Sequence, residues 1–208
     1  TISAVDDDVI SLSNLQRQVL YSEAEIGQPK VDAAAKAVRR LNPDITFHAI
    51  KERITTHTSA EILEGVDVVI DGSDNFATRL IVNDLCLAAR VPLVSAAIGQ
   101  FHGQIGTFRG WETDAPCYRC FVGDAHDPDD CDDCATQGVL GAMCGLMGSF
   151  AAMEAIREIT GFGDPQLSAP QAGLMALLAE GIVGGNMPWP LVVVGIMMGI
   201  GMIMAQVR

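Results

Sequence analysis

Short apolar, β-branched segments alternate with amphipathic segments along the first hundred residues of this chain. The clearest strand covers residues 66–70 (Val-Asp-Val-Val-Ile), a helical pattern covers about 77–89, and a second apolar run covers 91–95. Strand–helix–strand order favours parallel pairing through right-handed crossovers. The sequence therefore predicts an α/β fold, a Rossmann-like, doubly wound and mostly parallel sheet.

The same reasoning predicts the other elements. Residues 1–5 form a buried strand, and Pro29 opens a helix that Asn42-Pro43 ends. Further elements are a strand at 45–50, a short helix capped at Thr58 or Ser59, a strand at 103–108 in a hairpin with the Val94 region, and a helix at 148–160 ended by Gly161. Residues 124–133 are dense in acids and proline, which predicts a loop.

Charge and cysteine usage limit the class of protein. The formal net charge is -13, so a nucleic-acid backbone is not an expected partner, and phosphate binding would need a local basic pocket. Asp6, Asp7 and Asp8 interrupt the segment where a secretory signal would need its apolar core. Two C-x-x-C pairs in such a domain favour metal or redox chemistry over structural disulfides. We expect a cytoplasmic location.

Several polar residues lie where a doubly wound sheet binds ligands, at the carboxyl ends of strands. Asp6 could accept hydrogen bonds from a ribose, Asn14 could donate to a phosphate oxygen, and Asp74 could hold magnesium. Arg17 and Lys30 could neutralise phosphate charge. Each residue alone has a simpler interpretation, as a turn former, a helix cap or a solvated charge. In this order on one sheet they form a pattern.

The motifs that carry this pattern resemble those of the ThiF/MoeB/HesA family, the bacterial relatives of the ubiquitin-activating enzymes. The matching stretches are Val5-Asp6-Asp7-Asp8, Ser13-Asn14-Leu15-Gln16-Arg17-Gln18, Gly27-Gln28-Pro29-Lys30, Ser73-Asp74-Asn75 with Arg79, Pro116-Cys117-Tyr118-Arg119-Cys120, and Gly138-Val139-Leu140-Gly141 after Cys134. They follow one another in the family's order over about residues 1–165.

The resemblance implies an ATP-dependent adenylyltransferase that activates the C-terminal Gly-Gly carboxylate of a ubiquitin-like sulfur-carrier protein, with ATP and magnesium as cofactors and a homodimer as the assembly. Carried over by position, Asp6 binds ribose and Asp74, beside Asn75, holds magnesium. Asp8, Ser13 and Asn14 line the nucleotide site, and Arg17 and Lys30 contact phosphates. The alternatives are a non-catalytic nucleotide-binding module and a nicotinamide or flavin Rossmann protein.

One part of the family pattern is missing. The family's glycine-rich loop, which cradles phosphate at a helix N-terminus, should precede the first strand, and no G-x-G-x-x-G occurs near residues 1–10. We therefore expect the sheet to be N-terminally truncated and the chain to be a fragment or a fusion rather than an inactive enzyme.

The cysteines allow more than one interpretation. Cys117 and Cys120 have the spacing of half a tetrahedral zinc site, which the family completes with a second C-x-x-C. Cys131 and Cys134 could complete it here, or the first pair could be an orphaned half-site. Cys134 also occupies the place where some family members carry a cysteine that bonds to the activated carrier, although Asp132 and Asp133 oppose the thiolate such a residue needs.

The last forty residues differ from the rest in composition. Residues 168–208 contain only Glu180 and Arg208 as charged side chains, and residues 191–205 contain none. We expect an apolar helical segment over 166–208, a candidate transmembrane helix, with membrane association through 190–206. Ala169 to Met175 and the Met187-Pro188-Trp189-Pro190-Leu191 run resemble membrane segments of the oligopeptide transporter (OPT) family.

These observations divide the chain into residues 1–165, an incomplete nucleotide-binding domain, and residues 166–208, the apolar segment. If the first part is autonomous, deletion of residues 168–208 should leave it folded and more soluble, because an exposed apolar segment lowers solubility. The alternative is that the tail replaces a missing element of the sheet and completes its core. In that case the same deletion should lower the melting temperature.

Overall fold

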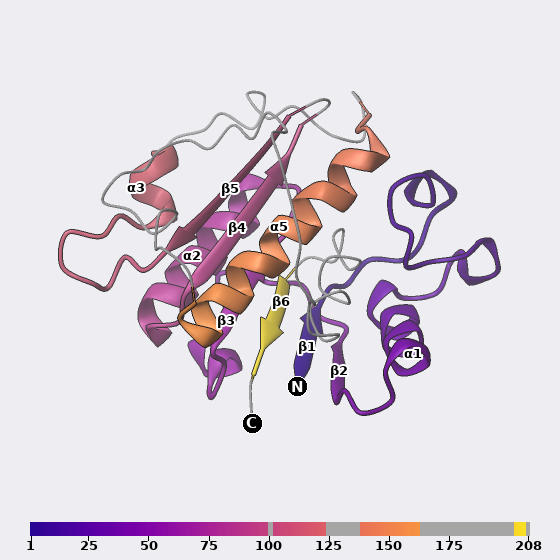
Figure 1. Cartoon of the computed structure of the whole chain (residues 1–208), viewed down its shortest axis with the longest axis horizontal. Helices are drawn as coiled ribbons and strands as arrows, with labels where there is room; N and C mark the ends of the chain where they lie inside the picture. Colours follow the sequence, from indigo (N-terminus) through magenta and orange to yellow (C-terminus); the bar gives the residue numbers. More distant parts are fainter. Residues whose placement is uncertain (100–101, 124–137, 163–201, 207–208) are drawn as a thin grey trace.

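The computed structural model describes residues 1–99, 102–123, 138–162 and 202–206, and these build one six-stranded sheet with helices on both faces (Figure 1). The strands lie in the order β2-β1-β6-β3-β4-β5. Their bounds are β1 Ile2–Val5, β2 Phe47–Ile50, β3 Val68–Asp71, β4 Leu93–Ile98, β5 Gly103–Phe108 and β6 Met202–Ala205. The strands predicted at 1–5, 45–50, 66–70, 91–95 and 103–108 are all present.

Two helices cover each face of the sheet. Helices α1 (Lys30–Leu41) and α5 (Gly141–Thr160) pack on one face, while α2 (Phe76–Ala89), the short α3 (Tyr118–Val122) and the 3-10 turn η3 (Ala60–Leu63) pack on the other (Figure 1). Along β3, Val68 and Ile70 lie in the hydrophobic core between the sheet and helices α1 and α5 (the α1/α5 core). Val69 lies in the core on the opposite face, against α2 (the α2 core), as the two-residue period of a strand requires. The doubly wound architecture is confirmed.

The prediction of a mostly parallel sheet is wrong. β1 pairs with β2 and β3 pairs with β4 in parallel, but β4 and β5 form the expected antiparallel hairpin. β6 runs antiparallel to both β1 and β3. The sheet is therefore mixed, with two parallel pairs that point the same way and an antiparallel strand inserted between them.

The prediction of a helical tail is wrong for the end of that segment, because Met202–Ala205 is strand β6. Residues 191–201 lie outside the described residues. Met202 and Met204 face the α2 core and Ile203 faces the α1/α5 core, and all three are at most 3% exposed. Without β6, β1 and β3 would each present an edge of unpaired backbone groups, and an extended segment satisfies both edges while a helix satisfies neither.

The strand is also fixed at its ends. The Asp67 amide donates to the Ala205 carbonyl (3.0 Å), and the backbones of Thr1 and Gln206 exchange two hydrogen bonds of 2.8 and 3.0 Å. In the part of the chain that the structure describes, no helix is long and apolar enough to cross a membrane. The predicted membrane association through 190–206 has no support, since residues 202–204 are buried inside the sheet.

Substitution of Ile203 tests the role of β6. Ile203→Ala should lower the free energy of unfolding by about 2–5 kcal/mol and the Tm by about 5–15 °C, because it leaves a cavity in the α1/α5 core. The matched control Gln206→Ala, just beyond the strand, should stay within about 0.5 kcal/mol of wild type. Thermal and urea unfolding give both values.

Deletion of residues 202–208 is the stronger form of this test. It exposes the facing edges of β1 and β3, so we expect loss of the cooperative transition or aggregation. A truncated chain with unchanged Tm and higher solubility would contradict the β6 placement and restore the view that the tail is separate from the domain.

Candidate functional site

The predicted site residues follow two strands that end at the same level of the sheet. Val5 of β1 and Asp71 of β3 both pair with Met202 of β6. The segments that begin at Asp6 and Gly72 therefore leave the sheet from the same edge, separated by two strand spacings, or about 10 Å. This edge is the carboxyl end of the parallel strands, where doubly wound sheets bind nucleotides.

Asp6, Asp8 and Lys30 form the part of the site at the end of β1. The Asp8 amide donates to Asp6 Oδ1 (2.7 Å), which orients the Asp6 carboxylate across the turn. Lys30 Nζ lies 2.6 Å from Asp8 Oδ2, and the Lys30 amide donates to the Asp8 carbonyl. The Lys30 side chain is 8% exposed and that of Asp8 is 66% exposed. The ammonium group is thus held at the N-terminus of α1, within reach of an anion that replaces or joins Asp8.

Ser13, Asn14 and Arg17 lie on the loop that leaves β1 and returns to α1. A bridge between Val9 and Pro29 closes this loop. The 3-10 turn η1 (Leu12–Asn14) begins at Ser11, whose amide donates to the buried Asn14 side chain (3.0 Å). The Ser13 and Ser11 hydroxyls are 2.8 Å apart. These bonds give the predicted nucleotide-lining residues a fixed backbone.

Arg17 is a partly exposed cation that lies beside the start of helix α5. Its Nη1 donates to the Ser13 carbonyl (2.9 Å), and it makes no ion pair with any residue that the structure describes. Gly141 at the beginning of α5 packs so closely that a Cβ there would lie 2.4 Å from the Gln16 carbonyl oxygen and 3.4 Å from the Arg17 Cα. The Gly-Val-Leu-Gly and Asn-Leu-Gln-Arg motifs, far apart in sequence, are therefore in contact.

Tyr21 belongs to this part of the site, although no sequence motif marks it. It is 8% exposed, and its hydroxyl has no hydrogen-bond partner among the described residues. Burial raises the pKa of the phenol, and the negative charges of Asp6, Glu25 and Asp8 raise it further. The neutral ring forms an apolar wall beside the carboxylates that follow β1.

Asp74 and Asn75 lie on the loop between β3 and α2. Asn75 caps α2, since its Oδ1 accepts from the Thr78 amide (2.8 Å), and its Nδ2 lies 3.4 Å from Asp74 Oδ1. Asp74 is exposed. A single exposed carboxylate suits Mg²⁺, which keeps several waters and completes its shell with substrate phosphates. The described residues contain no cluster of three or more potential metal-ligating side chains.

The structure supports only part of the cysteine analysis. Cys117 and Cys120 face each other with their sulfur atoms 3.5 Å apart, at the start of α3. Cys131 and Cys134 lie outside the described residues, so zinc binding by all four cysteines and a catalytic Cys134 stay predictions. Cys86 and Cys144 are buried, and burial with the nearby Asp71 carboxylate raises the pKa of Cys86.

Together, a doubly wound sheet with an acidic first strand end, a loop carrying Arg17 and an acidic loop after β3 mark the chain as one of the Rossmann-like α/β proteins. Comparison with known families identifies which one: the ThiF family model matches residues 1–178. The chain belongs to the ThiF family.

Curated relatives agree. The chain is 44% identical over 160 residues to the SAMP-activating enzyme E1 of Haloferax volcanii (77% of this chain, 58% of the relative). It is 40% identical over 164 residues to the molybdopterin-synthase adenylyltransferase of Escherichia coli (79% and 65%). It is 38% identical over 166 residues to the sulfur carrier protein ThiS adenylyltransferase of the same organism (79% and 64%). The chain thus spans about 58–65% of the length of these relatives.

Among solved structures, the fold is similar to Escherichia coli MccB crystallised with ATP. The TM-score is 0.64 at 21% identity, and the match covers 80% of this chain and 51% of MccB. The OPT resemblance has no such support. The ThiF match extends to residue 178 and so includes Ala169 to Met175, one of the two stretches on which that resemblance depended.

The raised pKa of Tyr21 predicts the alkaline stability of the site. A folded-state pKa above the unfolded value of about 10 stabilises the fold fully below that pH, and this stabilisation is lost as pH rises further. Tyr21→Phe should therefore reduce the fall in free energy of unfolding between pH 9 and 11 (roughly one unit either side of the tyrosine pKa). Urea unfolding measures it. An unchanged slope would show that the phenol ionises freely in the folded chain.

Proposed function

We propose that this chain is the nucleotide-binding part of an ATP-dependent adenylyltransferase that activates the C-terminal carboxylate of a ubiquitin-like sulfur-carrier protein. The observation that carries the proposal is the contact of the Arg17 loop with the start of α5, at the sheet edge where Asp6 and the Asp74 loop emerge. The names of the curated relatives, which include a molybdopterin-synthase adenylyltransferase and a sulfur carrier protein ThiS adenylyltransferase, support the same activity.

In the proposed reaction a carboxylate oxygen of the carrier attacks the α-phosphorus of ATP. The new bond forms the acyl-adenylate while the bond to the bridging oxygen breaks and pyrophosphate leaves. Asp6 would hold the ribose through its oriented carboxylate, because Asp8 already fixes its position. Arg17 and Lys30 would neutralise the negative charge that develops on the phosphates.

Lys30 has a specific part in this scheme. Its ion pair with Asp8 holds a nearly buried ammonium group in place without nucleotide. Because the Asp8 side chain is mostly exposed, the carboxylate can turn towards solvent when a phosphate takes its place. This exchange keeps one anion beside Lys30 at each stage, which avoids the cost of an unpaired buried charge.

Magnesium would bind at Asp74 and supply Lewis-acid stabilisation of the phosphate oxygens. Asn75 would fix the loop through its cap on α2. Binding of zinc by Cys117 and Cys120, assembly as a homodimer and a cytoplasmic location belong to the proposal as well, on the family resemblance. The particular carrier would be chosen by surfaces outside this site.

ATP–pyrophosphate exchange tests the proposal. The assay uses the 208-residue chain, and the same chain preceded by the strand and glycine-rich loop that the family resemblance implies. Exchange by the extended chain, dependent on magnesium and on a carrier ending in Gly-Gly, is the expected result. ATP binding without exchange would indicate a non-catalytic nucleotide-binding module, and no exchange with any such carrier would refute the proposed activity.

Arg17→Ala tests the phosphate contact in the chain that shows exchange. The rate should fall at least ~100-fold, the scale for one preorganised transition-state contact, with a much smaller change in ATP affinity. Arg53→Ala is the control, because Arg53 is a largely exposed arginine whose ion pair with Asp7 lies at the same sheet edge. Equal effects of the two substitutions would reduce Arg17 to a general surface charge.

A further inference from the structure

Arg79 is a buried cation placed where helix electrostatics disfavour it. It lies in the first turn of α2, just after the Asn75 cap, and its side chain is 8% exposed. A helix N-terminus carries partial positive charge, so a cation there is unfavourable, and a buried guanidinium needs a full set of partners. A buried arginine in this unfavourable position suggests that the groups it contacts have a functional role.

The partners of Arg79 belong to three neighbouring segments of the sheet edge. Nη2 donates to the carbonyls of Ser73 and Ala96, the latter at 3.2 Å, and Nη1 donates to Ser95 Oγ (3.3 Å). Nη1 also lies 3.9 Å from Asp71 Oδ2, on a carboxylate that is 0% exposed. The guanidinium therefore ties the end of β3 and the loop after it to β4.

Two of these contacts act on the residue just before Asp74. The Ser73 carbonyl accepts a hydrogen bond from Arg79, and the Ser73 amide donates to Asp71 Oδ1 (2.9 Å). With both peptide groups of Ser73 held by buried charges, the backbone position of Asp74 is fixed although its side chain is exposed. Asn75 fixes the other side of Asp74 by capping α2.

We propose that Arg79 is a positioning residue that, together with Asp71, presents the Asp74 carboxylate to the magnesium of a bound nucleotide. This inference rests on the proposed function, since it takes Asp74 as the magnesium ligand. A lysine at position 79 keeps the charge opposite Asp71, but one ammonium group cannot span the Ser73 carbonyl, the Ala96 carbonyl and Ser95 Oγ in the planar geometry that a guanidinium offers.

The test is the coupling between magnesium and ATP binding, measured by isothermal titration of the chain with ATP in the presence of Mg²⁺ or of EDTA. In Arg79→Lys, the factor by which Mg²⁺ tightens ATP binding should fall about tenfold, the lower end of the effect of outer-shell groups on metal affinity. ATP affinity in EDTA should stay within about twofold of wild type, a change of about 0.4 kcal/mol in binding free energy.

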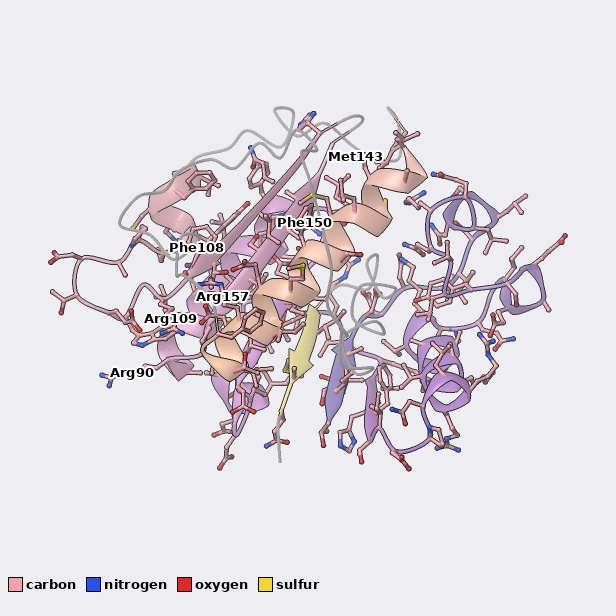
Figure 2. The ribbon with its side chains drawn as sticks, viewed as in Figure 1. Arg90, Phe108, Arg109, Met143, Phe150 and Arg157 are labelled. Atoms are coloured by element: carbon pink, nitrogen blue, oxygen red, sulfur yellow. The ribbon has the colours of Figure 1, made fainter. Side chains whose placement is uncertain are left out.

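Arg157→Lys is the matched control. Arg157 on α5 is also nearly buried, at 12% side-chain exposure, and pairs with Glu154 and Glu158 close to Arg109 (Figure 2). It lies in the last turn of α5, the helix whose start contacts the Arg17 loop. It should lower the Tm without changing the coupling. If Arg79→Lys also lowers only the Tm, Arg79 is a structural residue and the proposal is wrong.

Asp74→Asn separates this proposal from the proposed function. It should abolish the coupling in both the wild-type and the Arg79→Lys background, so that the two substitutions are not additive. A wild-type chain without coupling, or one whose coupling survives Asp74→Asn, would remove the magnesium role of Asp74 and this inference with it. Loss of coupling with Asp74→Asn but not with Arg79→Lys would overturn the role of Arg79 alone.

Discussion

The arrangement of this chain depends on the pairing of β6 with two strands at once. β1 and β3 point the same way and do not pair with each other. The four-residue strand β6, Met202–Ala205, pairs with the facing edges of both. Because Val5 and Asp71 pair with the same residue of β6, this strand also sets the relative level of the two acidic segments that form the candidate site. The integrity of the site and the stability of the fold thus rest on one backbone interaction.

Local sequence patterns predicted most of the elements. The periodicity of the apolar residues located α1, α2 and five of the six strands, and Gly161, in the left-handed conformation at φ 65°, ends α5 as expected. The tail was predicted as a helix because an uncharged run of Val, Ile, Met and Gly fits a buried strand as well as an apolar helix, and only the unpaired edges of β1 and β3 decide between them. Such a long-range requirement leaves no local signal.

The site was predictable to the extent that motifs mark it. Asp6, Arg17, Lys30 and Asp74 were selected from their order along the chain, whereas Tyr21 was missed because its burial beside Asp6 and Asp8 depends on the folded loop. In the sequence, Arg79 accompanies the Ser73-Asp74-Asn75 motif without a role of its own. An arginine in the first turn after an asparagine cap opposes the helix dipole, and that signal could have identified it.

We propose that segments far apart in sequence bind one nucleotide at one edge of the sheet. Hydrogen–deuterium exchange of the chain with and without ATP and Mg²⁺ tests it most directly, because exchange reports each segment separately. We expect slower exchange in three segments together: residues 6–8, the loop around Asn14 and Arg17, and residues 72–75. Protection of only one of these segments, or protection confined to β5 and α3, would contradict it.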